Sequence, residues 1–137
     1  MGRVFFNTRK NVHSLTGAYT VLASDSNKEF ILNAAAGAAI TLPSVADMGE
    51  GWHCKFIVGT AFATSNWQIT ATAAVIRGVV SEAEIDTEDD HPSTVAGTTI
   101  DFVHSLEKLG DYVELTCDGT NIFLNGQTAL DGAVLLA

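Results

Sequence analysis

The amino-acid sequence predicts an all-β protein: a single compact antiparallel β-sandwich or barrel, jelly-roll-like, with an extended N-terminal arm. Short β-prone segments recur at a spacing of roughly ten residues, which is typical of sandwiches and barrels. Turn residues separate these segments, and no long stretch has the periodicity of an amphipathic helix. The chain has 137 residues, the length of one domain.

The first half of the chain supplies the opening strands. The cluster Ser24–Asn27 marks a turn between two β-prone segments. The alanine-rich run 33–38 is too short to stand as a helix in water and contains a glycine, so we expect a turn or a single helical turn there. Pro43 stops the segment before it, because proline cannot donate to a sheet. The expected strands are Tyr19–Ala23, Glu29–Leu32 and Ala39–Leu42.

Two later segments alternate between apolar and polar residues, which is the period of a half-buried strand. In the segment His53–Val58 the alternation places Lys55 on the face opposite Cys54. In the segment Asp111–Cys117 it places Glu114 on the polar face of that strand. Asp118-Gly119 predicts a hairpin turn after the second segment. The chain then returns through Ile122–Leu124 and turns again at Asn125-Gly126. Further strands are expected at Trp67–Thr72, Val75–Val80 and Thr98–Val103.

The charge of the chain is strongly acidic and unevenly distributed. The net charge is −9 and the pI about 4.6, so the protein repels a phosphate backbone and we expect no nucleic-acid partner. Residues 81–97 read as a long exposed loop. The loop allows two interpretations: it is a solvated segment, or its carboxylate oxygens bind a hard cation. Its acidic residues are Glu82, Glu84, Asp86, Glu88, Asp89 and Asp90.

The N-terminus combines basic and aromatic residues without a clear period. We assign residues 1–18 to an arm and residues 19–137 to a β-rich domain. The arm has the composition of a segment that orders on an acidic, partly apolar surface. A frayed terminus is the alternative interpretation. The residues expected to make the contact are Arg3, Phe5, Phe6, Arg9 and Lys10.

The sequence carries no pattern of an enzyme. A zinc site needs three or four convergent ligands, and the histidines His13, His53, His91 and His104 lack that spacing. The elbow Gly-x-Ser-x-Gly, the phosphate loop and the dinucleotide fingerprint are all missing from the sequence. We therefore expect no catalytic activity, no cofactor and no metal.

Four further residues each allow two interpretations. Cys54 and Cys117 are buried thiols or, if their strands meet, a disulfide. Trp52 and Trp67 belong to the core or an interface, or they form a platform for a sugar.

The sequence also lacks membrane and secretion signals. No apolar run reaches the ~20 residues that span a bilayer, and the first residues lack the apolar region of a signal peptide. We expect no membrane partner and synthesis in a cytosol.

Three segments carry a family resemblance. They read YTVLASDSNKEFILNAAAGAAITLP over 19–43, GWHCKFIVGT over 51–60, and GDYVELTCDGTNIFLNG over 110–126. Together they resemble the head decoration, or cement, proteins of tailed bacteriophages. The closing segment departs from that pattern at Ile122-Phe123, where a tryptophan is expected.

The resemblance implies a structural role on a virus particle. It implies a homotrimer on the outer surface of the phage head, made in the host cytoplasm, that bridges subunits of the major capsid protein and stabilises the shell. It also implies an N-terminal segment that reaches along the shell. The alternative function is a recognition module of a phage tail or fibre that binds a glycan of the host surface.

Overall fold

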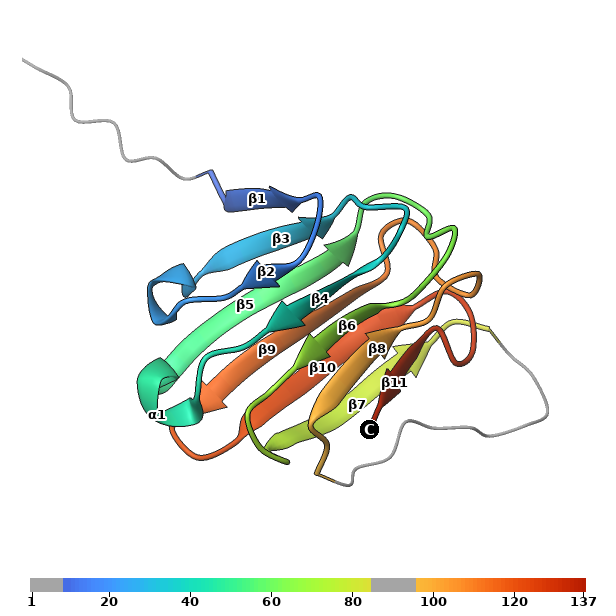
Figure 1. Cartoon of the computed structure of the whole chain (residues 1–137). Helices are drawn as coiled ribbons and strands as arrows, with labels where there is room; N and C mark the ends of the chain where they lie inside the picture. Colours follow the sequence, from blue (N-terminus) through green and yellow to red (C-terminus); the bar gives the residue numbers. More distant parts are fainter. Residues whose placement is uncertain (1–8, 85–95) are drawn as a thin grey trace, which may run out of the picture.

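The structure is a computed structural model that describes residues 9–84 and 96–137. Two β-sheets pack against each other, so the predicted all-β sandwich is confirmed (Figure 1). In spatial order, the six-stranded sheet contains β1 (Asn11–Leu15), β3 (Lys28–Leu32), β5 (Glu50–Val58), β9 (Tyr112–Asp118), β10 (Ile122–Thr128) and β7 (Ile76–Glu82). The five-stranded sheet contains β11 (Val134–Leu136), β8 (Thr99–Phe102), β6 (Trp67–Thr70), β4 (Ala38–Thr41) and β2 (Tyr19–Thr20).

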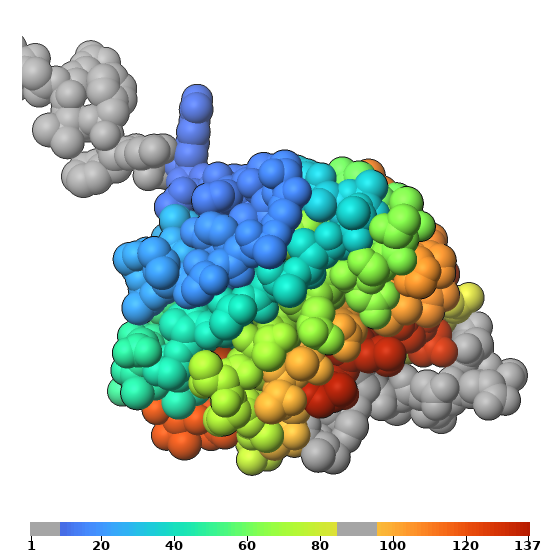
Figure 2. Space-filling model, viewed as in Figure 1, coloured from blue at the N-terminus to red at the C-terminus, as the bar shows by residue number. Residues whose placement is uncertain are grey.

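The first six strands alternate between the two sheets. β1, β3 and β5 pair in parallel in one sheet, and β2, β4 and β6 pair in parallel in the other. The chain therefore winds as a flattened coil, each turn of which adds one strand to each sheet. Figure 2 shows the result as bands of surface colour that follow the chain order from blue through green.

This winding differs from the antiparallel, jelly-roll-like pairing that the sequence predicts. Both sheets are mixed: antiparallel pairs join β5 to β9, β9 to β10, β6 to β8 and β8 to β11. The physical reason is that side chains alternate with a period of two in either kind of ladder, so the apolar pattern carries no information about strand direction.

The closing hairpin forms as predicted, but its second strand continues further. The carboxylate of Asp118 accepts the backbone N–H groups of Thr120 and Asn121 at 2.8 and 2.6 Å, which closes the turn between β9 and β10. The turn predicted at Asn125-Gly126 is wrong, because β10 runs through both residues to Thr128. A Cβ at Gly126 would lie 2.7 Å from the carbonyl oxygen of Tyr112, so a glycine at this position allows β9 and β10 to approach each other closely.

The N-terminal strand also begins earlier than the sequence predicts. Residues 11–15, expected to belong to the arm, form β1 at the edge of the six-stranded sheet. Leu15 is buried, and the ring of His13 lies 5.2 Å from that of Tyr19 on β2. These contacts close the end of the core, so this part of the predicted arm belongs to the sandwich.

The core lies between the sheets and is strongly aromatic. The rings of Phe30 and Phe56 stack with centroids 5.0 Å apart, and Trp67 and Phe102 are fully buried. Short helical segments lie between some of the strands, namely η1 (Ala23–Asp25) and α1 (Val45–Met48). No helix in the described ranges is long and apolar enough to cross a membrane.

Candidate functional site

The structure describes two of the five arm residues predicted to make contacts. Arg3, Phe5 and Phe6 lie outside the described residues, whereas Arg9 and Lys10 are exposed immediately before β1. The Nζ atom of Lys10 lies 2.6 Å from Oε1 of Glu29 on β3. The hydrogen bond and the negative charge of Glu29 raise the pKa of Lys10. These cations therefore stand at one edge of the six-stranded sheet.

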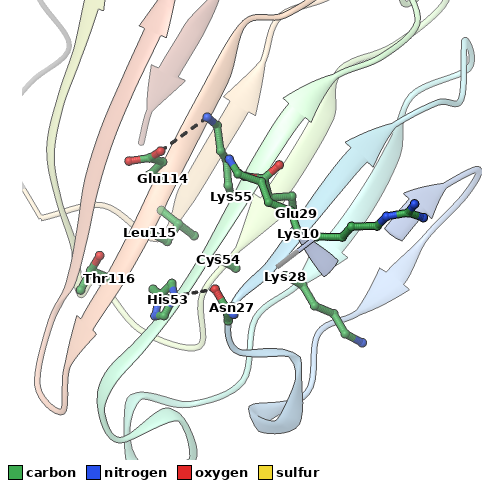
Figure 3. Close-up of a pocket in the computed structure, with 11 residues that line it drawn as sticks. Lys10, Asn27, Lys28, Glu29, His53, Cys54, Lys55, Glu114, Leu115 and Thr116 are labelled. Atoms are coloured by element: carbon green, nitrogen blue, oxygen red, sulfur yellow. Dashed lines mark hydrogen bonds and ion pairs between the residues drawn. The ribbon is translucent and has the colours of Figure 1, made fainter. Parts of the chain in front are cut away.

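Arg9 and Lys10 border a shallow groove on the outer face of this sheet (Figure 3). The groove has a volume of about 520 Å³ and crosses β3, β5 and β9 beside β1. Most of its polar lining comes from outward-facing positions of these strands, where side chains alternate with those of the core. The full lining is Arg9, Lys10, Asn27, Lys28, Glu29, His53, Cys54, Lys55, Glu114, Leu115 and Thr116.

Charges of opposite sign alternate across the groove. The strand register places Lys55 on β5 between Glu29 on β3 and Glu114 on β9. The Nζ atom of Lys55 lies 3.5 Å from Oε1 of Glu114 and 4.0 Å from the centroid of the Tyr112 ring. Figure 3 shows this ammonium directed at the neighbouring carboxylate. Lys55 thus combines an ion pair with a cation–π contact.

His53 occupies one end of the groove and is held on both sides. Its Nδ1 lies 3.1 Å from the carbonyl oxygen of Gly51, and its Nε2 lies 3.1 Å from Oδ1 of Asn27. The backbone N–H of Asn27 donates to the carbonyl of His53 at 2.7 Å. Asn27 has a positive φ of 68°, which asparagine tolerates better than most residues. The imidazole is therefore oriented by the turn that leads into β3.

A buried carboxylate fixes the same end of the sandwich. Asp25 accepts hydrogen bonds from the hydroxyl of Tyr19 at 3.0 Å, the backbone N–H of Leu22 at 2.9 Å and the ammonium of Lys28 at 2.6 Å. Burial acts to raise the pKa of Asp25, but these hydrogen bonds and the charge of Lys28 outweigh it and lower the pKa. Burial and Asp25 raise the pKa of Tyr19. This cluster connects β2, η1 and β3.

The two cysteines are separate buried thiols and form no disulfide. Burial and, to a smaller extent, the charge of Asp25 raise the pKa of the Cys54 thiol far above its ordinary range. A thiol reacts as its thiolate, so Cys54 is a structural residue although it borders the groove.

The tryptophans belong to the core, which confirms one of their two interpretations. Trp52 is 3% exposed and Trp67 is fully buried. Their indole N–H groups donate to the carbonyls of Ala23 and Ala34, both at 3.1 Å. Neither ring forms a platform on the surface.

The structure describes only the beginning of the acidic segment. The Glu82 and Glu84 carboxylates accept the backbone N–H groups of Gly132 and Asp131, both at 3.2 Å. Within 9–84 and 96–137, no group of three or more His, Cys, Asp or Glu side chains is placed to hold a metal ion. Residues 85–95 lie outside the described ranges, and they contain the other acidic residues of this segment and its histidine: Asp86, Glu88, Asp89, Asp90 and His91.

Comparisons of the chain with protein-family models, with curated proteins and with solved structures find no match. A function is therefore inferred from the charge of the chain and from the geometry of its surface. The groove was not predicted from the sequence. Its signal was present in the outward positions of His53, Lys55 and Glu114, but their proximity depends on the register between β5 and β9.

Proposed function

We propose that this chain is a virion structural protein: an outer capsid decoration, or cement, protein of a tailed bacteriophage. In this role a homotrimer bridges neighbouring subunits of the major capsid protein and stabilises the head. The protein acts by binding and not by catalysis. It is made in the host cytoplasm and is located on the outer surface of the virion.

The position and charge of the N-terminal segment carry this proposal. The first ten residues contain three of the seven basic residues of the chain and no acidic side chain, whereas the whole chain has a net charge of −9. Arg9 and Lys10 lie at the edge of the sandwich beside β1. A basic segment whose sequence contains Phe5 and Phe6, and whose last residues Arg9 and Lys10 lie at one edge of an acidic body, suits attachment to an acidic, partly apolar shell.

The proposed mechanism is that of a clamp. Each trimer contributes three N-terminal segments, and each segment binds an adjacent capsid subunit with modest affinity. Once one segment is bound, the others bind at high effective concentration, so the trimer stays attached without any single strong contact. Pressure inside the head must then break several contacts together before neighbouring subunits separate.

The test is binding to phage heads prepared without this protein. Removal of residues 1–10 should abolish sedimentation with the heads, while circular dichroism and the midpoint of thermal unfolding remain close to those of the full chain. Lys108→Glu serves as a charge control, because Lys108 is exposed and belongs to the loop between β8 and β9 and not to the N-terminal segment. Full binding by the truncated protein would refute attachment through the arm. Failure of the full chain to bind heads would refute the decoration role.

The groove supports one alternative, a recognition module for a host-surface glycan. Asn27, His53 and Thr116 present polar groups along a cavity of about 520 Å³, which suits the hydroxyl groups of a saccharide. The buried tryptophans supply no stacking surface for it. A glycan screen with the wild type and with His53→Ala distinguishes this function: a bound glycan that the variant loses would favour recognition over decoration.

A further inference from the structure

The six-stranded sheet begins with a strand that has a neighbour on one side only. β1 pairs in parallel with β3 over its whole length, from Asn11 to Leu15. In the part of the chain that the structure describes, no strand pairs with the other side of β1. Figure 1 shows β1 at one end of the sheet and β7 at the other. Such an edge carries backbone groups to which a further strand can bind.

The hydrogen bonds of β1 show which of its backbone groups point outward. The backbone N–H of Asn33 donates to the carbonyl of Leu15 at 2.8 Å, so Leu15 directs its backbone groups at β3. Backbone groups alternate in direction along a strand, and those of His13 therefore also point at β3. Val12 and Ser14 direct their N–H and C=O groups away from the sheet, and both residues are exposed.

The other sheet edges in the described ranges are shorter or less regular. β2 contains two residues and β11 three. β7 is longer, but Ile76 and Gly97 exchange two backbone hydrogen bonds of 3.0 and 2.9 Å at its beginning. Gly78 then has a φ of +147°, which lies outside the range of a regular strand. β1 keeps its register with β3 over five residues without a bulge and contains no proline.

Two cations stand at the beginning of this edge. Arg9 and Lys10 directly precede β1 in a chain whose net charge is −9. The side chain of Lys10 is 71% exposed, although its Nζ is paired with Glu29. Val12 adds an apolar side chain that is 54% exposed. The edge therefore combines outward backbone groups with positive charge and an apolar contact, which suits a segment with acidic and apolar side chains.

We propose that β1 binds an extended, acidic segment of a partner protein, which becomes a seventh strand of the sheet. Hydrogen bonds from the backbone of Val12 and Ser14 hold the segment, and its carboxylates lie near Arg9 and Lys10. This is the mode of recognition known as β-strand addition. The partner is the major capsid protein, so the inference rests on the proposed function and extends its contact from the arm to β1.

The short length of β1 fits the clamp mechanism. Only Val12 and Ser14 direct backbone groups outward, so one copy makes few hydrogen bonds with the segment. A contact of this size is weak by itself. It becomes effective when several linked copies bind neighbouring capsid subunits, because each bound copy raises the effective concentration of the next.

A proline at position 12 tests the proposal. Proline has no N–H and is tolerated on edge strands where this group would face outward, so Val12→Pro keeps the bonds between β1 and β3. Its affinity for phage heads prepared without this protein should fall at least about tenfold, because a buried partner carbonyl loses its donor. Val12→Ala is the matched control, since it also shortens the side chain but keeps the N–H. Equal affinities of the two variants would overturn the proposal.

Hydrogen–deuterium exchange gives a readout that needs no substitution. In the free protein the amides of Val12 and Ser14 should exchange quickly, whereas those of His13 and Leu15 are bonded to β3 and should exchange slowly. On the heads all four amides should exchange slowly. Mass spectrometry with fragmentation to single residues measures this difference. Unchanged exchange of Val12 and Ser14 on the bound protein would overturn strand addition.

Neutralisation of the two cations tests the chemistry of the partner. The double variant Arg9→Gln, Lys10→Gln should bind heads more weakly than the wild type, and its affinity should depend less on salt concentration. Lys108→Gln, in the loop between β8 and β9, is the control and should bind as the wild type does. Wild-type affinity of the double variant would overturn an acidic partner segment.

These measurements separate failure of the inference from failure of the proposed function. If the full chain does not bind heads, both the decoration role and this partner are refuted. If the full chain binds heads while exchange at Val12 and Ser14 is unchanged, only strand addition is refuted. Light scattering covers a second copy as the occupant: a native mass that falls in Val12→Pro would show that β1 pairs with another copy, and would overturn the proposal.

Discussion

Lys55 and Glu114 face each other across the two central strands of the six-stranded sheet, with Nζ 3.5 Å from Oε1. The same ammonium lies 4.0 Å from the centroid of the Tyr112 ring, two residues before Glu114 on β9. The side chains of Lys55 and Glu114 are 22 and 49% exposed, so solvent screens their attraction. The pair therefore contributes to the surface chemistry of the sheet more than to the stability of the fold.

Replacement of Lys55 by methionine tests this conclusion. Lys55→Met keeps an unbranched apolar stem over Tyr112 and removes the charge. Because exposed ion pairs and cation–π contacts are each worth about 1 kcal/mol or less, the free energy of unfolding should fall by no more than about 2 kcal/mol. Urea unfolding of wild type and variant at neutral pH measures the change. A loss above about 3 kcal/mol would show that the pair is a structural element of the fold.

The outward direction of both residues could be predicted from the sequence, whereas their proximity could not. Strict alternation in His53–Val58 and Asp111–Cys117 separates core from surface positions, and the structure has the same pattern of burial along β5 and β9. Alternation shows which face of the sheet each side chain takes, but not which residues of neighbouring strands lie opposite each other. That register is set by the loops and by the partner strand. Because the register brings the lining residues of the groove together, the site could not be recognised from either strand alone.

The differences at β1 and β10 have local causes. Asn11–Leu15 has only two aliphatic residues, Val12 and Leu15, and becomes a strand because it pairs with β3 along its whole length. Asn125-Gly126 has the chemistry of a turn, but Gly126 allows the close approach of Tyr112 within the sheet. In both places tertiary contacts override the local preference of the sequence.

The buried cysteines should be inert in the folded protein. Cys54 is 4% and Cys117 1% exposed, and burial raises the pKa of Cys54, so the reactive thiolate is scarce. We expect that a disulfide reagent such as dithionitrobenzoate modifies neither thiol at neutral pH within the time that it labels free cysteine. In concentrated urea both thiols should react. Rapid stoichiometric labelling of the native protein would contradict the burial of these side chains.

Gly78 should be among the least replaceable residues of the sheet. Its φ of +147° is unfavourable for other residues, and an added Cβ would clash with the carbonyl oxygen of Leu124 on β10. Gly78→Ala must displace backbone between β7 and β10, so we expect a loss of about 3 kcal/mol or more in unfolding free energy. Gly17→Ala is the matched control, because nothing lies within 4 Å of its Cβ. Urea unfolding measures both losses, and equal stability of the two variants would contradict the strand contact.

Asp25 should make the stability of the protein depend on pH in the acidic range. Burial acts to raise its folded-state pKa, but the hydrogen bonds from Lys28, Leu22 and Tyr19 and the charge of Lys28 outweigh burial and lower the pKa. A carboxylate with a lowered pKa stabilises the folded state fully above its unfolded pKa of about 4. This contribution is lost as the pH falls through the lower, folded-state pKa.

Asp25→Asn separates this effect from the general acid sensitivity of the chain. At pH 6 the variant should lose about 2 kcal/mol, because Lys28 loses its charged partner and the amide accepts fewer hydrogen bonds. As the pH falls from about 4 through the lower folded-state pKa, Asp25 takes up a proton first in the unfolded and then in the folded state and becomes as neutral as asparagine, so the difference between the two proteins should shrink. Urea unfolding from about pH 6 to about pH 2.5 measures both curves. Tyr19→Phe removes one of the hydrogen bonds that lower the pKa of Asp25 and keeps the carboxylate, so it should show the same direction of pH dependence as the wild type with a smaller amplitude. A difference between wild type and Asp25→Asn that stays constant across this range would show that the lowered pKa of Asp25 does not contribute to folding.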